Sequence, residues 1–179
     1  MVSSLSGFFR TSLSHGEDMI TIRAEIEHVE NYLKIQEVRY GDIMEYSIEI
    51  SEDIKKNYIV KMTLQPLVEN ALYHGLRNQR KKGKIRIYSI EDENNIFLIV
   101  EDNGIGMEPE QVDKLNEEMY NEKLCKAAWN NRSSGFGISN VNRRLKLYYG
   151  EEFGLIIESE AGVGTKMIVV VPRMEQVEE

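Results

Sequence analysis

The sequence predicts an α+β sandwich rather than a doubly wound parallel sheet, and two observations lead to that fold class. First, apolar residues recur at helical or strand spacing in the order helix, strand, helix, strand, strand, helix, loop, helix, strand, strand. Second, the last two pairs of strands are each joined by a short turn, which suits antiparallel neighbours. No internal repeat interrupts this order.

The predicted fold opens with a long amphipathic helix and a strand. The helix covers roughly 21–40: Thr21 can cap its first turn, and Gly41 ends it. Its apolar stripe consists of Ile22, Ile26, Val29 and Leu33. The stretch "MEYSIEI" over 44–50 then alternates with period two, which predicts a half-buried strand.

The next helix begins after Thr63, which we expect to cap it, and it tolerates Pro66 in its first turn. Its apolar stripe consists of Leu64, Leu67, Val68, Ala71 and Leu72. The opposite face presents Pro66, Asn70, Tyr73 and Arg77, with His74 beside them. That face is either simply solvated or holds a ligand. An asparagine oxygen suits a Mg²⁺ ion that phosphates already neutralise.

The second half of the chain adds two pairs of strands and two helices. The strands are, in order, 84–90, 95–102, 154–160 and 165–172. One helix starts after Pro109, and another covers about 138–149 before Gly150. Between these helices, residues 120–134 show no clean periodicity and contain loop residues.

Composition excludes several classes of protein. The chain has 179 residues, 41% hydrophobic and 29% charged, which fits one sizeable globular domain. A net charge of −8 argues against non-specific nucleic-acid binding, which depends on basic surface. The single cysteine, Cys125, leaves no internal disulfide and suits a reducing compartment. No apolar run approaches the roughly 18 residues of a membrane span, and the N-terminus lacks the apolar core of a signal peptide.

Three glycine-containing stretches lie downstream of these helices. In "EDNGIGM", Gly104 and Gly106 permit a tight turn and close approach by a ligand, and Asp102 would present a carboxylate to a cleft. In "SSGFG", Gly135 and Gly137 precede a helix whose first N–H groups favour a phosphate. Each stretch is equally compatible with a plain turn or loop, and "AGVGT" with a hairpin turn alone.

In this order the motifs resemble the N, G1, G2 and G3 boxes of the ATP-binding superfamily of gyrase, heat-shock chaperones, histidine kinases and mismatch-repair ATPases. "LQPLVENALYHGL", "VEDNGIGM" and "GFGISNVNRRLKLYYG", with "EIEHVENYLKIQEVRYGD" before them, resemble the LytS-like sensor histidine kinases. The resemblance covers nearly the whole chain. It implies the GHKL fold, a two-layer α/β sandwich with a mixed, mostly antiparallel sheet and helices on one face.

The resemblance also implies roles for individual residues. The adenine end would consist of Asp102, Gly104, Gly106, Gly164 and Thr165. Asp102 would accept a hydrogen bond from the adenine amino group, the two G1 glycines would shape the pocket, and the last pair would close it. The irregular stretch between the G1 and G2 boxes would be the ATP lid, which the lack of periodicity supports.

The phosphate end implied by the resemblance consists of Asn70, His74, Arg77, Gly135 and Gly137. Asn70 would coordinate Mg²⁺, and the two glycines would border the phosphates. His74 and Arg77 are candidates to neutralise phosphate charge, and either is equally compatible with a surface position. In hydrolysing members of the superfamily, a glutamate one turn before the asparagine activates water. Pro66 stands there, and Glu69 points about 100° away from Asn70, which favours phosphoryl transfer over hydrolysis.

The histidines do not match the acceptor of the family, which lies in a Pro-His-Phe context on an earlier helix. His15 precedes a glycine, His28 falls off the apolar stripe of its helix, and His74 belongs to the nucleotide helix. Apolar residues recur at helical spacing over 5–13. We therefore expect 1–40 to be the end of the dimerisation and histidine-phosphotransfer region with a linker helix, and the acceptor to lie upstream. Residues 41–179 would be the catalytic ATP-binding domain.

The sequence thus predicts the catalytic domain of a two-component sensor histidine kinase that uses ATP and Mg²⁺. Its partners would be an upstream acceptor helix, in a homodimer, and a response regulator. The full protein would be a sensor in the plasma membrane, and this part its soluble cytoplasmic domain. Two other interpretations stay open: a self-contained ATPase or ATP-gated interaction module, and a domain that binds no nucleotide. A steady-state ATPase assay distinguishes the kinase from the ATPase.

Overall fold

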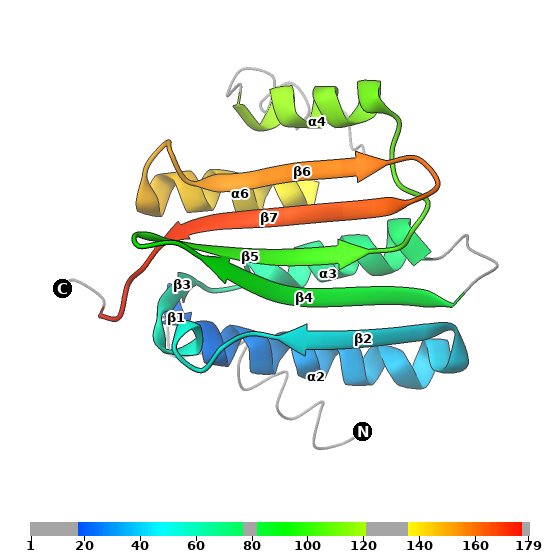
Figure 1. Ribbon diagram of the computed structural model, residues 1–179, viewed down its shortest axis with the longest axis horizontal. Helices are drawn as coiled ribbons and strands as arrows, with labels where there is room; N and C mark the ends of the chain where they lie inside the picture. Colours follow the sequence, from blue (N-terminus) through cyan, green and yellow to red (C-terminus); the bar gives the residue numbers. More distant parts are fainter. Residues whose placement is uncertain (1–17, 77–81, 121–135, 177–179) are drawn as a thin grey trace.

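The computed structural model describes residues 18–76, 82–120 and 136–176, and one five-stranded sheet dominates them (Figure 1). In spatial order its strands are β2 (Met44–Glu49), β4 (Gly83–Glu91), β5 (Asn95–Asp102), β7 (Gly164–Pro172) and β6 (Gly154–Glu160). β2 pairs with β4 in parallel, and the other three pairs are antiparallel. The prediction of a mixed, mostly antiparallel sheet is confirmed.

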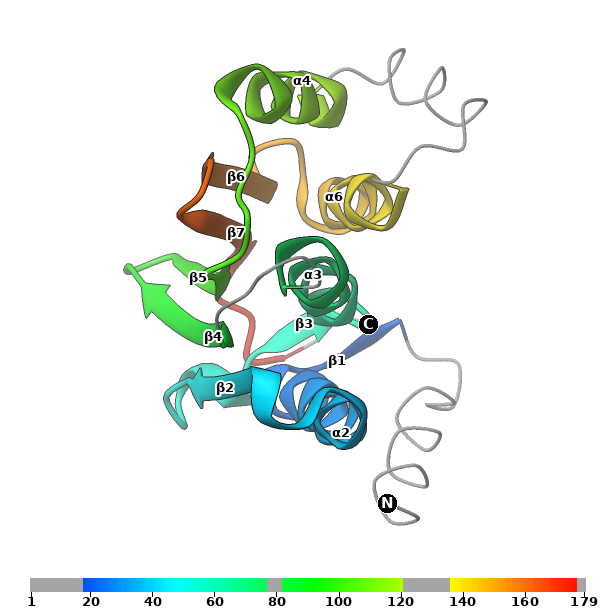
Figure 2. The same ribbon diagram turned by 90° about the vertical axis from the view of Figure 1, so that its right-hand side faces the viewer.

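Helices cover one face of this sheet, which Figure 2 shows from its edge. The helices are α2 (Ile22–Tyr40), α3 (Leu64–Asn70), α6 (Phe136–Tyr149) and α4 (Pro109–Tyr120). α2, α3 and α6 lie side by side on that face, and α4 lies beyond the edge strand β6 (Figures 1 and 2). No described helix covers the opposite face, so the predicted two-layer sandwich is confirmed.

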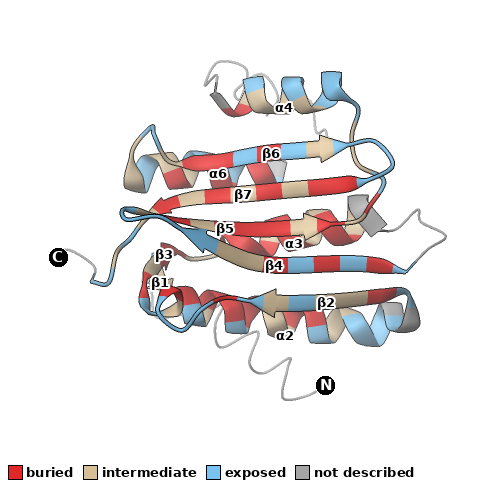
Figure 3. Cartoon of the chain, in the orientation of Figure 1, coloured by how far each residue is buried: buried red, intermediate tan, exposed pale blue. Residues whose placement is uncertain are grey.

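The core lies between the two layers, because side chains alternate along each strand (Figure 3). In β4, Ile85 and Ile87 are buried against the helices, whereas Lys84 and Arg86 are exposed on the other face. The helices contribute their apolar stripes to the same core. The stripe predicted for α2 is buried throughout: Ile22, Ile26, Val29 and Leu33.

Several short elements were not predicted. β1 (Met19–Thr21) and β3 (Tyr58–Val60) form a separate antiparallel pair, and the 3₁₀ turns η1 (Gly41–Ile43) and η2 (Ile54–Lys56) flank β2. Three residues are too few for a period-two pattern to stand out. α3 also continues as a π-helix, η3 (Ala71–Leu76), where an α-helix was expected.

The two predicted helix caps differ in outcome. Thr21 caps α2 as expected, since its Oγ1 accepts a hydrogen bond from the Ala24 N–H at 3.2 Å. The prediction for Thr63 is wrong: its hydroxyl donates to the Val60 carbonyl at 2.6 Å and caps no N–H group. Thr63 already has a helical backbone, unlike the extended backbone usual for a capping residue. The carboxylate of Glu25 accepts hydrogen bonds from backbone N–H groups there instead.

His28, which falls off the apolar stripe of α2, is nevertheless buried. Its side chain is only 1% exposed, and its Nε2 makes a hydrogen bond with Oε1 of Gln65. α2 packs against α3, and this contact buries a wider face than the apolar stripe alone. A histidine with a polar partner fits inside that contact.

Three predicted features lie partly or wholly outside the described residues: the helix-spaced segment 5–13, Arg77, and the irregular stretch 120–134 except Tyr120, which ends α4. In the part of the chain that the structure does describe, no helix has both the length and the apolar character needed to cross a membrane.

Candidate functional site

The adenine end of the candidate site begins with Asp102, the last residue of β5. Asp102 lies on the same face of the strand as Leu98 and Val100, which are buried against the helices, and it is itself 5% exposed. Its Oδ1 accepts a hydrogen bond from the Gly104 N–H at 2.7 Å. Burial raises the pKa of Asp102 to about 6, although backbone hydrogen bonds from Gly104 and Thr165 partly oppose this. A buried carboxylate on the helix side of the sheet can accept a hydrogen bond from a base.

The loop after Asp102 lies directly against the turn between β6 and β7. Gly106 has a φ of +64°, and a Cβ added there would lie 1.9 Å from the Glu160 carbonyl oxygen. Gly164 has a φ of +145°, and its added Cβ would lie 2.0 Å from the Asp102 carbonyl oxygen. Neither position has room for a side chain. The G1 and G3 motifs therefore form one compact structure, as the resemblance implied they would.

Ser159 on β6 links the two motifs by hydrogen bonds, and the sequence analysis did not identify this residue. Its hydroxyl accepts a hydrogen bond from the Met107 N–H and donates one to the Gly164 carbonyl, both at 2.9 Å. It also lies 2.9 Å from Oγ1 of Thr165 in a further hydrogen bond. Thr165 pairs with Asp102 across the β5–β7 ladder and is buried, as its predicted role in closing the pocket requires. A lone serine at a strand end carries no motif that could have revealed this role.

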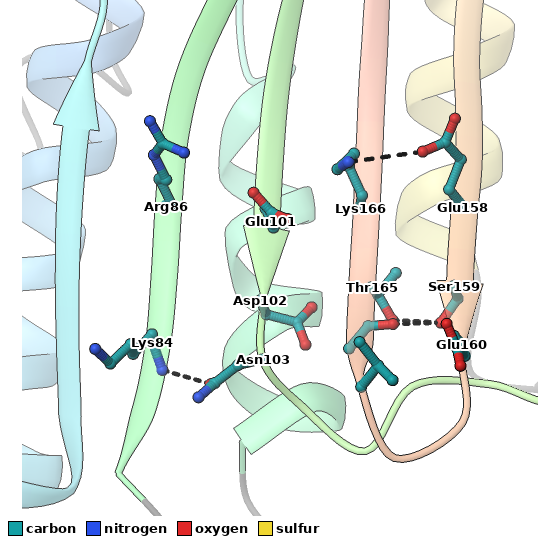
Figure 4. Close-up of a pocket in the computed structure, with 12 residues that line it drawn as sticks. Lys84, Arg86, Glu101, Asp102, Asn103, Glu158, Ser159, Glu160, Thr165 and Lys166 are labelled. Atoms are coloured by element: carbon teal, nitrogen blue, oxygen red, sulfur yellow. Dashed lines mark hydrogen bonds and ion pairs between the residues drawn. The ribbon is translucent and has the colours of Figure 1, made fainter.

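A pocket of about 480 Å³ lies at the same end of the sheet, and Figure 4 shows its lining. It is lined by charges of both signs from the outer face: Lys84, Arg86, Lys166, Glu101, Glu158 and Glu160. Asp102 and Thr165 also border it, but they are buried with the residues that face the helices. Three cationic and three anionic side chains give this hollow no net attraction for a phosphate chain. The helix side of Asp102 is therefore the better candidate for a nucleotide.

The phosphate end is built on α3 and η3. Asn70 is the last residue of α3 and is partly exposed, and η3, which follows it, packs against β4 and β5. A π-helical stretch of this kind often marks a functional site. His74 lies in η3, but its side chain, like Arg77 and Gly135, is outside the described structure.

The start of α6 lies close to this helix. A Cβ added at Gly137 would be 3.6 Å from Cβ of Pro66, so the G2 motif meets the first turn of the N-box helix. The structure thus brings the predicted motifs together in two pairs, G1 with G3 and N with G2. Among the described residues, no three His, Cys, Asp or Glu side chains gather to hold a metal. A metal here would take few protein ligands, as Mg²⁺ bound to phosphates does.

Glu69, next to Asn70, is engaged elsewhere. Its Oε1 accepts a hydrogen bond from Nε2 of Gln65 at 2.8 Å, and Gln65 in turn contacts His28 of α2. Pro66 occupies the first turn of α3, as predicted. Pro66 has no proton-transfer group, and one carboxylate oxygen of Glu69 is engaged by Gln65.

Asn142 on α6 is a second polar residue that the sequence reasoning missed. Its Nδ2 donates to the Met119 carbonyl at 2.9 Å, and its Oδ1 accepts from the Leu155 N–H at 2.8 Å. It joins α6 to both α4 and β6 and is almost fully buried. Its spacing from Ile138 and Leu145 on the apolar face of α6 was a signal that could have identified it.

The sheet, the one-sided helices and the paired glycine motifs define an ATP-binding domain of the histidine kinase and gyrase type. The chain belongs to the family of histidine kinase-, DNA gyrase B- and HSP90-like ATPases, whose model matches residues 58–175. A second family model, described as histidine kinase, matches residues 1–44. The family expected from the motifs is confirmed.

Two curated relatives agree with this assignment. The chain is 30% identical to the sensor histidine kinase YesM of Bacillus subtilis over 99% of its length. It is 29% identical to the sensor protein LytS of Bacillus anthracis over 97% of its length. It spans only 28% of the length of either relative.

Two solved structures share the fold. One is the histidine kinase domain of a blue-light activated kinase from Erythrobacter litoralis, with a TM-score of 0.59 and 17% identity. The match covers 96% of this chain and 72% of that one. The other is histidine kinase ThkA in complex with response regulator protein TrrA, with a TM-score of 0.61 and 16% identity, covering 97% of this chain and 48% of that one.

Proposed function

We propose that this chain is the catalytic ATP-binding part of a two-component sensor histidine kinase. Residues 41–179 would bind ATP, and 1–40 would be the end of the dimerisation and phosphotransfer region with its linker helix. The observation that carries the proposal is Asp102, a buried carboxylate held in a glycine frame on the helix side of the sheet. Family membership and the names of the relatives support it.

The proposed nucleotide lies with its base at Asp102 and its phosphates toward α3 and the start of α6. Gly104, Gly106, Gly164 and Thr165 would surround the base. Asn70, Gly135 and Gly137 would border the phosphates. An ionised carboxylate accepts a hydrogen bond from the adenine amino group, whereas guanine presents an acceptor oxygen there, so the pocket would select adenine.

The residues present fit a Mg²⁺ ion. Asn70 offers a neutral oxygen ligand at the end of α3, and no acidic cluster among the described residues competes for the ion. When bound, Mg²⁺ would neutralise phosphate charge during transfer. His74 and Arg77 would add positive charge from the same helical segment and the residues after it.

The site favours transfer to a histidine over transfer to water. Pro66 has no proton to give or take, and Glu69 is hydrogen-bonded to Gln65. Without a base to activate water, catalysis depends on positioning the acceptor, which we place on the upstream dimerisation helix of a homodimer. The phosphoryl group would then pass to a response regulator, and the full protein would be a membrane sensor with this part in the cytoplasm.

The test compares transfer with hydrolysis in the full-length protein supplied with γ-labelled ATP. We expect acid-labile label on a histidine of the upstream dimerisation helix and slow release of inorganic phosphate. Rapid release of phosphate without labelled protein would support the self-contained ATPase instead. Label on His28 is not expected, because that side chain is buried against Gln65.

A further inference from the structure

The short connector between β3 and α3 contains an unusual backbone. Met62 has a φ of +58°, and it is the one non-glycine residue with positive φ among those the structure describes. This left-handed conformation is unfavourable for a residue with a side chain, so surrounding contacts must hold it. Met62 stands two residues before the start of α3, the helix that ends at Asn70.

The first of these contacts comes from α2. The Glu25 side chain is 1% exposed, and its two oxygens accept hydrogen bonds on either side of Thr63. Oε2 accepts from the Met62 N–H at 3.0 Å, and Oε1 accepts from the Leu64 N–H at 2.8 Å. One carboxylate therefore spans the entry into α3 and takes the place of the cap that Thr63 does not supply.

The second contact comes from α6, at the carbonyl of the same residue. Nη2 of Arg144 donates to the Met62 carbonyl at 2.7 Å. One turn further along α6, the Tyr149 hydroxyl accepts from the Val60 N–H at 3.1 Å. The N–H of Met62 is thus held from α2, and its carbonyl is held from α6.

We propose that Glu25 and Arg144 are positioning residues for phosphoryl transfer: they hold Met62 in its left-handed conformation and so fix the direction in which α3 presents Asn70. The inference rests on the proposed function, since it assumes that Asn70 binds Mg²⁺. Through Met62 alone, the orientation of α3 then depends on both α2 and α6. α2 lies within the region that matches the histidine kinase model, and α6 follows the stretch proposed as the ATP lid.

The adenine end has separate supports, and this makes the inference testable. Asp102 and its glycines are held by hydrogen bonds to Gly104 and Ser159 and by the β5–β7 ladder, and these bonds involve other residues than those that hold Met62. We call the contacts of Glu25 and Arg144 with Met62 the clamp. Its loss should weaken the part of ATP affinity that Mg²⁺ adds. The affinity measured without metal should change little.

The experiment measures the dissociation constant of ATP for the full chain with Mg²⁺ and with a chelator. The ratio of the chelator value to the Mg²⁺ value gives the factor by which Mg²⁺ strengthens ATP binding. Arg144→Gln should lower this ratio several-fold, by no more than the loss of Asn70 itself, while leaving metal-free binding within about twofold. Arg143→Gln is the matched control, because Arg143 is the exposed neighbour on the same helix. An unchanged ratio in Arg144→Gln, or equal loss with and without metal, would overturn the positioning role.

A pair of substitutions at Met62 keeps the test valid if Arg144→Gln fails to fold. Valine resists the left-handed conformation and asparagine tolerates it, so Met62→Val should shrink the ratio and Met62→Asn should preserve it. Equal ratios in the two variants would count against the inference.

Asn70→Ala in the same assay separates the two proposals. If it leaves the ratio intact, the assignment of Asn70 to the metal fails. If Asn70→Ala brings the ratio to one while the Arg144 and Met62 variants leave it unchanged, Asn70 keeps its role and only the positioning role of the clamp is refuted.

Discussion

The two ends of the candidate site are built by different means. At the adenine end, Asp102 and the glycines at 106 and 164 are fixed by hydrogen bonds and close backbone contacts between neighbouring strands and their turn. At the phosphate end, Asn70 stands where α3 gives way to a π-helix, and the entry into that helix is held by side chains from α2 and α6. One end is fixed by backbone contacts within the sheet, and the other is fixed by side chains from two helices.

This difference has a functional consequence. A base-recognition group attached to a sheet cannot move without breaking the ladder, so adenine recognition should persist in every state of the protein. Asn70, the proposed metal ligand, stands on a helix whose entry is held by two other helices, so it can respond to either of them. Recognition and phosphoryl transfer should therefore be separable by mutation.

The largest effect should come from removing the metal ligand. We predict that Asn70→Ala lowers phosphoryl transfer roughly 100- to 1,000-fold, the range for losing one preorganised electrostatic group, with only a modest loss of nucleotide affinity. Transfer is measured with an acceptor histidine supplied in trans. Asn94→Ala, at an exposed turn on the opposite end of the sheet, is the control. Transfer at a near wild-type rate in Asn70→Ala would remove α3 from the phosphate end.

The second effect tests the adenine end. Asp102→Asn replaces an acceptor oxygen by an amide donor facing the adenine amino group, so we expect ATP binding to weaken by about 1–3 kcal/mol, roughly 10- to 100-fold. Calorimetry measures this directly. Glu101→Gln is a matched control, because Glu101 precedes Asp102 but belongs to the outer face. Unchanged ATP affinity in Asp102→Asn would contradict the assignment of the base pocket.

The third prediction uses the pKa of Asp102, which burial raises to about 6. In the proposed site only the ionised form would accept from adenine, so ATP affinity should increase as the pH rises through about 6 and decrease as the carboxyl gains a proton below it. Between pH 5 and pH 7 the change should be roughly tenfold. The phosphates of ATP also titrate here, so the wild-type curve is compared with that of Asp102→Asn. Parallel curves for the two proteins would show that Asp102 does not control binding.

The same division explains what the sequence could and could not predict. The five strands of the main sheet, the glycine turns and the place of Asp102 at the end of β5 were predictable, because alternation and turn chemistry are local and were read from adjacent residues. Glu25 was not, because its carboxylate meets Met62 from a helix nearly forty positions away in the sequence, and no local pattern records that contact. Thr63 misled for the same reason: it is a good capping residue, but a distant carboxylate occupies the position it would have filled.

The smallest expected effect concerns the outer face of the sheet. Arg86 borders the charged pocket and pairs with Glu49 at 2.7 Å, and both side chains are about half exposed. An exposed pair of this kind contributes little, so Arg86→Gln should leave the free energy of unfolding almost unchanged. ATP affinity should stay within about twofold, because the nucleotide is proposed to lie on the opposite face. Thermal unfolding and calorimetry measure the two quantities. A tenfold loss of ATP affinity in Arg86→Gln would place the phosphates in the outer pocket and reverse the assignment of the two faces, whereas an unchanged value leaves the helix side of Asp102 as the binding surface.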